Sequence, residues 1–196
     1  SLGISAPVAS WTMSVFLLFD LSMLFYRRHL AKQEYLNTKE QYEHELCKSE
    51  DDEHRQLIHQ QLGQLEQRWA VTDSTLWFNV TAGTLLAAGF TASFVISAPI
   101  ILPVSFLVCT MSVAMYISSG EYSTYKQKSL AFFDNSSKEL ATVSDEKEVI
   151  SARNDLILAM SKNAIMPIVL MGVYAASPPA ALVLTLLYTG YQMVKG

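Results

Sequence analysis

The chain has 196 residues, of which 51% are hydrophobic and 16% are charged, and its formal net charge is −4. This mildly acidic balance excludes the strongly basic surface that a direct nucleic-acid partner requires. Apart from Asp20, every charged residue lies in residues 27–73, in residues 121–162 or at Lys195, and the stretches between these blocks are almost wholly apolar. Because a bilayer core selects against uncompensated charge, this segregation predicts an all-α polytopic membrane protein.

Five stretches are predicted as transmembrane helices, since a helix needs about 20 mainly apolar residues to cross the hydrocarbon core. In chain order they are residues 8–26, 74–97, 100–119, 156–177 and 179–194. The fourth reaches full length only if Lys162 extends its ammonium group to the interface, and the fifth is short. Both would fit a locally thinned bilayer.

Basic residues gather at one set of span ends, and the opposite set carries no charge. Arg27 follows the first span, for example, and Arg68 precedes the second. By the positive-inside rule, the N-terminus and the short loops around Pro99 and Pro178 are expected to face out. Both polar blocks are therefore expected to face the inside.

The first polar block, residues 27–73, is predicted to be an inside-facing helical hairpin of coiled-coil type. Its residues are strong helix formers without proline, and apolar residues recur at helical spacing from Ile58 to Trp69. Ser49, with Asp52 three positions later, has the pattern of a capping box. This pattern predicts that the second arm of the hairpin starts at Ser49.

The second polar block, residues 120–155, is predicted to be an inside-facing helical segment. One helix is expected from Glu121 to about Leu140. A second helix should then start with Thr142 or Ser144 as its N-cap and run into the fourth span, because acidic residues follow both candidates and suit a helix N-terminus.

All four histidines lie in the first polar block near Cys47, but their spacing is poor for zinc, which needs four converging ligands. His54 and His59, for example, are five positions apart and point to different faces of a helix. A solvated hairpin is favoured over a metal site, and no metal or other cofactor is predicted. No phosphate loop, HExxH or GxSxG pattern is present, so no enzyme active site and no catalytic residue is predicted.

Asp20 is the one ionisable side chain deep in a predicted span, and such a carboxylate is by default a functional candidate that faces a bundle interior or a wet cavity. The alternative is a structural hydrogen bond to a neighbouring Ser, Thr or Tyr. Polar residues of the second and third spans could line the same cavity, although packing between helices is their commoner role. These candidates are Asn79, Thr81, Thr84, Ser105, Thr110 and Ser112.

Three prolines are predicted to shape the spans. Pro167 should kink the fourth span, because a proline removes one backbone hydrogen bond. Pro103 falls in the opening turn of the third span, and Pro179 can start the fifth span as its first helical residue.

The order of these segments resembles the YidC/Oxa/Alb family of membrane-protein insertases. The likeness covers nearly the whole chain: a span, an inside hairpin, two spans joined by a short outer turn, an inside segment, and two short spans joined by a proline turn. Local motifs agree, since Met166 and Pro167, the ILPV of residues 101–104 and the PAALVLTLLYTGYQ of residues 179–192 look like the family's motifs. The second span and both hairpins match in character only.

The resemblance implies a YidC/Oxa-like core that passes polar segments of client proteins through a hydrophilic groove into the bilayer. Such a protein acts as an insertase, a chaperone or an assembly factor for respiratory complexes. The implied partners are the lipid bilayer and hydrophobic client membrane proteins, with the ribosome or subunits of other membrane complexes as further partners. The organellar branch looks most similar, which favours the mitochondrial inner membrane over the thylakoid or the bacterial plasma membrane.

One departure from the family changes the charge of the groove. Asp20 falls about where many members carry an arginine, so the sign is inverted and acidic client segments would be repelled. Either the clients differ, or insertase activity has been weakened or lost. Two alternatives therefore stay open: a structural insertase-like subunit of a larger respiratory membrane complex, and a small cation transporter that uses Asp20.

Overall fold

The computed structural model describes residues 6–49, 51–96, 99–138 and 140–176. Within these ranges the protein has five helices and no strand, so the prediction of an all-α fold is confirmed. The helices are α1 (Ala6–Lys48), α2 (Asp52–Val95), α3 (Ile101–Ile117), α4 (Ser119–Ser137) and α5 (Val143–Ala176). The predicted fifth span, with Pro179, lies outside the described residues.

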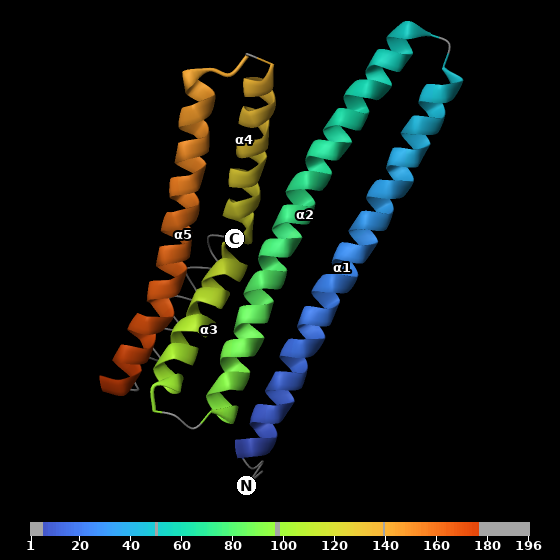
Figure 1. The fold of residues 1–196 in the computed structure, drawn as a ribbon. Helices are drawn as coiled ribbons and strands as arrows, with labels where there is room; N and C mark the ends of the chain where they lie inside the picture. Colours follow the sequence, from blue (N-terminus) through green and yellow to red (C-terminus); the bar gives the residue numbers. More distant parts are fainter. Residues whose placement is uncertain (1–5, 50, 97–98, 139, 177–196) are drawn as a thin grey trace.

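The helices form two antiparallel hairpins that lie side by side (Figure 1). The first hairpin is α1 with α2, and in the second α3 continues into α4, which turns back into α5. Helix α2 lies between α1 and the second hairpin, since it contacts α1 on one side and α3 and α4 on the other. The α1–α2 and α4–α5 turns are at one end of the bundle, and the start of α1 and the α2–α3 turn are at the other (Figure 1). We call these the hairpin end and the Pro99 end.

The predicted first and second spans do not end where the polar block begins, because each continues into an arm of the hairpin. The 43 residues of α1 and the 44 residues of α2 form rods about 65 Å long at about 1.5 Å per residue. This is roughly twice the ~30 Å thickness of a hydrocarbon core. One half of each rod carries the apolar sequence and the other half carries the polar block.

The turn between α1 and α2 differs from the predicted capping box. Asp51 is the N-cap of α2, and its carboxylate accepts a hydrogen bond from the backbone N–H of Glu53 at 3.2 Å. The Ser49 hydroxyl instead donates to the backbone oxygen of Asp51 at 3.3 Å. The prediction that Ser49 starts the second arm is therefore wrong by two residues, because the aspartate beside the first turn supplies a charged acceptor for the free N–H groups.

The start of α5 settles the choice between two predicted caps in favour of Thr142. The backbone N–H of Thr142 donates to the Asp145 carboxylate at 2.9 Å, and the backbone N–H of Asp145 donates to the Thr142 hydroxyl at 3.3 Å. This reciprocal pair is a capping box. At the other side of the turn, α4 ends at Ser137, three residues before the predicted end at Leu140.

Ser118 separates α3 from α4, and the two helices are bent by 60° at this break. Among the described residues, length and composition identify no single helix as a candidate to cross a membrane, whereas the bent pair formed by α3 from Pro103 onward and α4 passes the same test. Pro103 lies in the first turn of α3 and Pro167 lies inside α5, as predicted.

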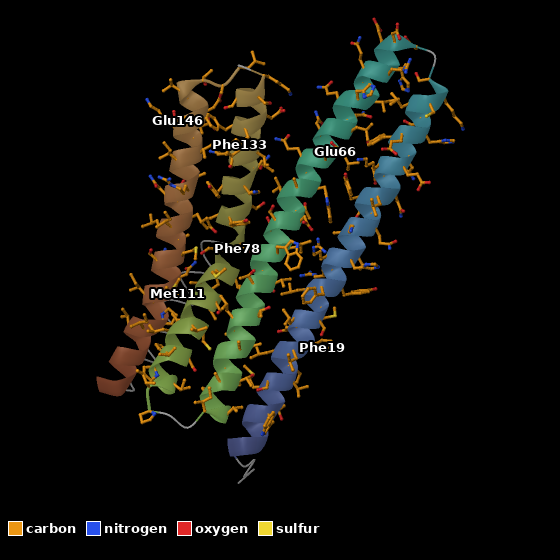
Figure 2. The ribbon with its side chains drawn as sticks, viewed as in Figure 1. Phe19, Glu66, Phe78, Met111, Phe133 and Glu146 are labelled. Atoms are coloured by element: carbon orange, nitrogen blue, oxygen red, sulfur yellow. The ribbon has the colours of Figure 1, made fainter. Side chains whose placement is uncertain are left out.

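Small side chains fill the contacts between helices in the apolar half. Buried residues there are mainly alanine, serine and threonine, which allow helix backbones to approach closely. They include Ser14, Ala82, Ala87, Ser105, Thr110, Ser112, Ala114 and Ser118. Large apolar side chains point outward instead, as Phe19 does on the outer side of α1 (Figure 2).

Candidate functional site

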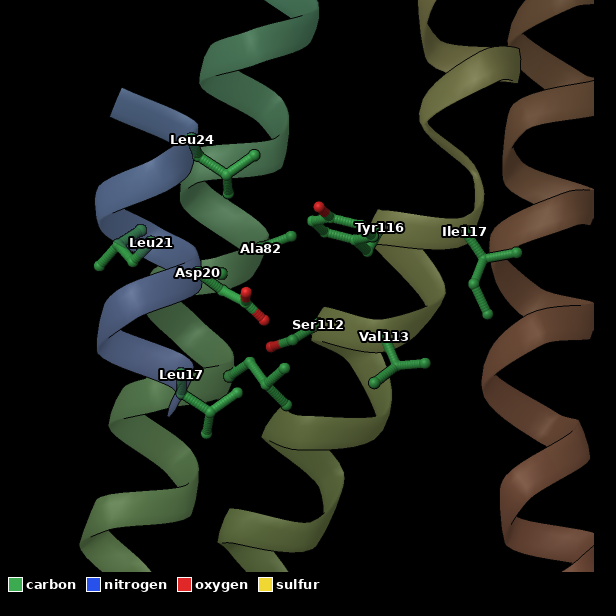
Figure 3. Close-up of a pocket in the computed structure, with 11 residues that line it drawn as sticks. Leu17, Asp20, Leu21, Leu24, Ala82, Ser112, Val113, Tyr116 and Ile117 are labelled. Carbon is green, nitrogen blue, oxygen red and sulfur yellow. The ribbon is translucent and has the colours of Figure 1, made fainter. Parts of the chain in front are cut away.

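A cavity of about 220 Å³ lies between α1, α2 and α3 (Figure 3), in the apolar half of the bundle. Asp20, Ser112 and Tyr116 are its polar wall residues. The other lining residues are aliphatic or small, namely Leu17, Leu21, Leu24, Ala82, Gly83, Leu86, Val113 and Ile117. We call this space the Asp20 cavity.

Helical spacing explains why Asp20 reaches this cavity. Leu17, Leu21 and Leu24 lie three to four residues from Asp20 or from each other, so all four occupy one face of α1. Leu21 and Leu24 pack against α2 at Gly83, where their Cδ1 atoms lie 3.5 and 3.4 Å from the position that a Cβ atom would take. The same packing directs the Asp20 carboxylate toward α3.

Asp20 and Ser112 point toward each other across the cavity (Figure 3). Asp20 is exposed, and within the described part of the chain its carboxylate makes no hydrogen bond and no ion pair. Ser112 is buried, with 1% exposure, and its hydroxyl donates to the backbone oxygen of Val108 at 2.7 Å. Its oxygen lone pairs remain available as acceptors.

Tyr116 follows Ser112 by one helical turn, so both hydroxyl groups lie on the same face of α3. Tyr116 is 48% exposed and extends toward α1 above the Asp20 carboxylate (Figure 3). The cavity therefore presents one carboxylate and two hydroxyl oxygens on otherwise aliphatic walls. Sequence reasoning missed Tyr116, although its spacing from Ser112 was a signal that could have found it.

The structure brings only Asp20 and Ser112 together among the predicted groove residues. Thr81, Thr84 and Thr110 each donate a hydrogen bond of 2.8 to 2.9 Å to the carbonyl four residues earlier in their own helix. They do not line the cavity, so the packing interpretation fits them better than the groove interpretation.

Asn79 and Ser105 also lie away from the Asp20 cavity. Ser105 is buried, with 5% exposure, in α3. The side-chain oxygen of Asn79 is buried and has no hydrogen-bond partner among the described residues. Of the six polar candidates in the second and third spans, Ser112 lines the Asp20 cavity and the other five do not.

An ion pair between α1 and α2 marks the level at which the apolar half of the first hairpin gives way to the polar half. The guanidinium of Arg28 contacts the Asp73 carboxylate at 2.8 Å and lies 4.7 Å from the centroid of the Trp77 ring. Phe25 packs edge to face on Trp77 at 6.3 Å. We call these four residues the boundary cluster.

A second aromatic contact joins α2 to α4 just beyond the bend. Phe78 and Tyr122 stack with ring centroids 4.2 Å apart and an interplanar angle of 7°. Burial raises the pKa of Tyr122 above its ordinary value.

A polar contact between Asn163 and Ser118 ties the bend between α3 and α4 to α5. The side-chain amide of Asn163 donates to the Ser118 hydroxyl at 3.0 Å, and Ser118 is fully buried. A polar cleft of about 320 Å³ opens beside it, lined in part by Glu121, Asp155 and Lys162. The serines and glycine of residues 118–120 were the sequence signal for this break.

No group of three or more His, Cys, Asp or Glu side chains converges on a metal position within the described ranges. Comparisons of the chain with protein-family models, with curated proteins and with solved structures found no match. The resemblance to the YidC/Oxa/Alb family accordingly stays a hypothesis, and the Asp20 cavity is the strongest candidate site on chemical grounds.

Proposed function

We propose that this protein is a membrane-embedded insertase or assembly factor, which helps polar segments of client membrane proteins to enter the bilayer at the Asp20 cavity. The observation that carries the proposal is the position of Asp20. An ionisable side chain midway along an apolar helical stretch, facing a cavity with two hydroxyl groups, is expected where polar groups are handled in hydrocarbon.

The outward-facing side chains support a membrane location. Large apolar residues with more than two-fifths of their surface exposed cover the Pro99 half of α1, α3 and α5. In water, an apolar surface of this extent is unfavourable, whereas lipid tails cover it at no such cost. These residues include Trp11, Phe16, Phe19, Leu107, Met111, Ile157, Leu158 and Ile165.

The boundary cluster supports a specific depth in the bilayer. Arginine and tryptophan are favoured where hydrocarbon meets headgroups, so Arg28 and Trp77 would lie at that level. The hairpin end would then project into the inside compartment, with the N-terminus outside. We propose the mitochondrial inner membrane as the location, following the resemblance to the organellar branch.

The mechanism is physical and involves no covalent step. A client segment that crosses the bilayer must bring its polar flank through hydrocarbon, where each charged group costs roughly 3 kcal/mol or more. Asp20, Ser112 and Tyr116 offer that flank hydrogen-bond and charge partners midway. The apolar part of the client then leaves toward lipid, because transfer into hydrocarbon is favourable for it.

A second candidate function is a structural subunit of a larger membrane complex that keeps an insertase-like arrangement. The hydrogen bonds of Thr81, Thr84 and Thr110 within their own helices favour it, because they leave few polar groups for a hydrophilic path. A cation transporter is less well supported. Such a site uses several converging oxygen ligands, and the Asp20 cavity offers one carboxylate and two hydroxyls.

The test is depletion of the protein from its native membrane, followed by complementation with wild type, Asp20→Asn and Ser22→Ala. Insertion of newly made membrane proteins is followed by protease protection. We expect insertion to fail on depletion, to return with wild type and to drop about tenfold with Asp20→Asn, a change of ~1.4 kcal/mol.

Ser22→Ala is the matched control, because Ser22 is two residues from Asp20, exposed, and bonded to the Leu18 carbonyl of its own helix. It should restore insertion fully. Normal insertion after depletion, accompanied by the loss of one membrane complex, would instead identify a structural subunit.

A further inference from the structure

The Asp20 carboxylate has no counter-charge within the described part of the chain. Basic side chains of the described residues lie in the polar blocks, and none lines the cavity. A carboxylate that faces aliphatic walls and has no counter-charge favours a partner that brings a positive charge. The cavity is also accessible, since Asp20 and Tyr116 are both exposed.

We propose that the Asp20 cavity binds the lysine side chain of a client transmembrane segment. This inference rests on the proposed function and names the class of client: segments that carry a lysine within or beside their apolar stretch. The lysine ammonium would be held by the Asp20 carboxylate and the hydroxyl oxygens of Ser112 and Tyr116.

The cavity matches lysine in both of its parts. The ammonium group has three donors and no acceptor, and the wall supplies one carboxylate and two hydroxyl oxygens as acceptors. The four-carbon stem is apolar, and it would lie along leucine side chains such as Leu17, Leu21 and Leu86.

Other cations fit the same walls less well. A calcium ion takes six to eight oxygen ligands, which this cavity does not offer. The arginine guanidinium is a planar fork of five donors, which is best matched by two parallel bonds to an open carboxylate. The cavity places its second and third acceptors on α3, across from Asp20, which suits a compact ammonium better.

The binding test uses the full-length protein in nanodiscs and synthetic transmembrane peptides of leucine and alanine. The peptides are identical except for one central residue, which is Lys, Arg, Leu or Glu. Binding is followed by fluorescence energy transfer between the labelled peptide and the labelled protein. We expect the Lys peptide to bind about tenfold more tightly than the Leu peptide, the Arg peptide to be intermediate and the Glu peptide to be weakest.

Two variants separate charge from structure. Asp20→Asn should remove the preference for Lys over Leu, and Asp20→Lys should shift the preference to the Glu peptide. Asp20→Asn keeps the shape, and Asp20 makes no hydrogen bond within the described residues, so folding should be preserved. Ser22→Ala should keep the full preference for Lys.

In a second experiment, the central Lys, Arg, Leu or Glu of these peptides is placed in the membrane segment of a client protein, and insertion of that client is measured. Preferential binding of the Lys peptide without any insertion would support the lysine site and overturn the insertase function. Insertion of all clients at equal rates, unchanged by Asp20→Asn, would support the insertase function and overturn the lysine site. Equal binding of the Lys and Leu peptides to wild-type protein would also overturn the lysine site.

Discussion

Arg28 of α1 and Asp73 of α2 form an ion pair in which the guanidinium Nε and Nη2 atoms each lie 2.8 Å from the same carboxylate oxygen. Both side chains are 27% exposed, and the guanidinium also lies over the Trp77 ring. The pair is 45 residues apart in sequence and joins the two arms where the apolar half ends. The boundary cluster therefore fixes the register of the first hairpin.

Loss of this ion pair should destabilise the protein. Because a charged hydrogen bond, the ion pair and a cation–π contact are removed together, Arg28→Ala is expected to lower the free energy of unfolding by about 2 kcal/mol. Asp73→Asn should lower it less, since an amide oxygen still accepts a hydrogen bond. Unfolding in mixed micelles, analysed as a double-mutant cycle of Arg28→Ala and Asp73→Ala, measures the coupling.

A second ion pair of the same hairpin provides the control. The Nζ atom of Lys39 lies 2.8 Å from a carboxylate oxygen of Glu66, but this pair lies in the polar, solvent-exposed arms of the hairpin. The hydrogen bond to Glu66 raises the pKa of Lys39 above 10.5, so any contribution is complete at neutral pH and is lost only as the pH rises through the raised value. At pH 7 the cycle of Lys39→Ala and Glu66→Ala should give no measurable coupling. Equal coupling for the two pairs would contradict the special role of the boundary cluster.

The sequence was sufficient to predict those features that depend on local pattern. The all-α fold and the positions of Pro103 and Pro167 follow from residues within one or two helical turns, whereas the sequence left both Thr142 and Ser144 open as the cap of α5. Contacts between helices were not predictable in this way. The Arg28–Asp73 pair becomes visible only when the two arms are aligned about the 49–51 turn, and the bond from Asn163 to Ser118 spans 45 residues.

The sequence predicted those residues of the candidate site that can be identified from their position along one helix. Asp20 was identified because it is the single charge in an apolar stretch. The role of each hydroxyl depends on whether it faces a neighbouring helix or bonds to its own backbone, which residue type alone does not decide. Thr81 and Ser112 both bond to their own helix, yet only Ser112 lines the cavity.

Gly89 is predicted to be required for the close contact between α2 and α3. A Cβ atom at Gly89 would lie 3.0 Å from Cγ1 and 3.3 Å from Cβ of Val108, and 3.2 Å from the Cys109 sulfur. Valine is branched at Cβ and has little freedom to move aside. Gly89→Ala should therefore lower the free energy of unfolding by about 1 to 3 kcal/mol.

Gly63 is the matched control for this substitution. It also lies inside α2, but a Cβ atom there would meet nothing within 4 Å. Because alanine is the better helix former, Gly63→Ala should raise stability by about 0.5 to 1 kcal/mol. Thermal unfolding in detergent followed by circular dichroism gives both values. Effects of the same sign at the two positions would contradict the packing argument.

The capping box of α5 predicts a pH-dependent helix start. Hydrogen bonds from the backbone N–H and from the hydroxyl of Thr142 lower the pKa of Asp145 below its ordinary 3.8. A lowered pKa in the folded state means that the stabilisation is complete above pH 3.8 and is lost as the pH falls through the lowered value. Thr142→Ala removes the hydroxyl but keeps the backbone N–H, which is the larger cause, so the pKa of Asp145 should move only part of the way back toward the ordinary value.

Carboxyl chemical shifts of Asp145, titrated by nuclear magnetic resonance, measure this change. Hydrogen exchange of the first turn of α5 should become moderately faster in Thr142→Ala at neutral pH, because the N–H of Asp145 loses the hydroxyl acceptor and keeps only the backbone oxygen of Thr142 at 3.1 Å. Ser144→Ala is the control, since Thr142 and not Ser144 is the cap. A pKa of Asp145 that is unchanged by Thr142→Ala would contradict the capping role.

The contact between Asn163 and Ser118 should hold the bend between α3 and α4. Ser118 is fully buried, so loss of its partner leaves a buried hydroxyl with one hydrogen bond fewer. We expect Asn163→Ala to lower the free energy of unfolding by about 1 to 2 kcal/mol. Asn154→Ala, at an exposed position of the same helix, should change it by less than about 0.5 kcal/mol.

The geometry of the bend gives a second and independent measurement of this contact. Spin labels on α4 and α5 report the distance between the two helices, and its distribution is narrow if the 60° bend is fixed. Asn163→Ala should broaden this distribution, because the hydrogen bond that joins α5 to the bend is lost and the Lys128–Glu148 pair, at 3.7 Å, is long and exposed. Asn154→Ala should leave it unchanged. Equal distributions in wild type and Asn163→Ala would mean that the backbone break at Ser118 alone sets the angle.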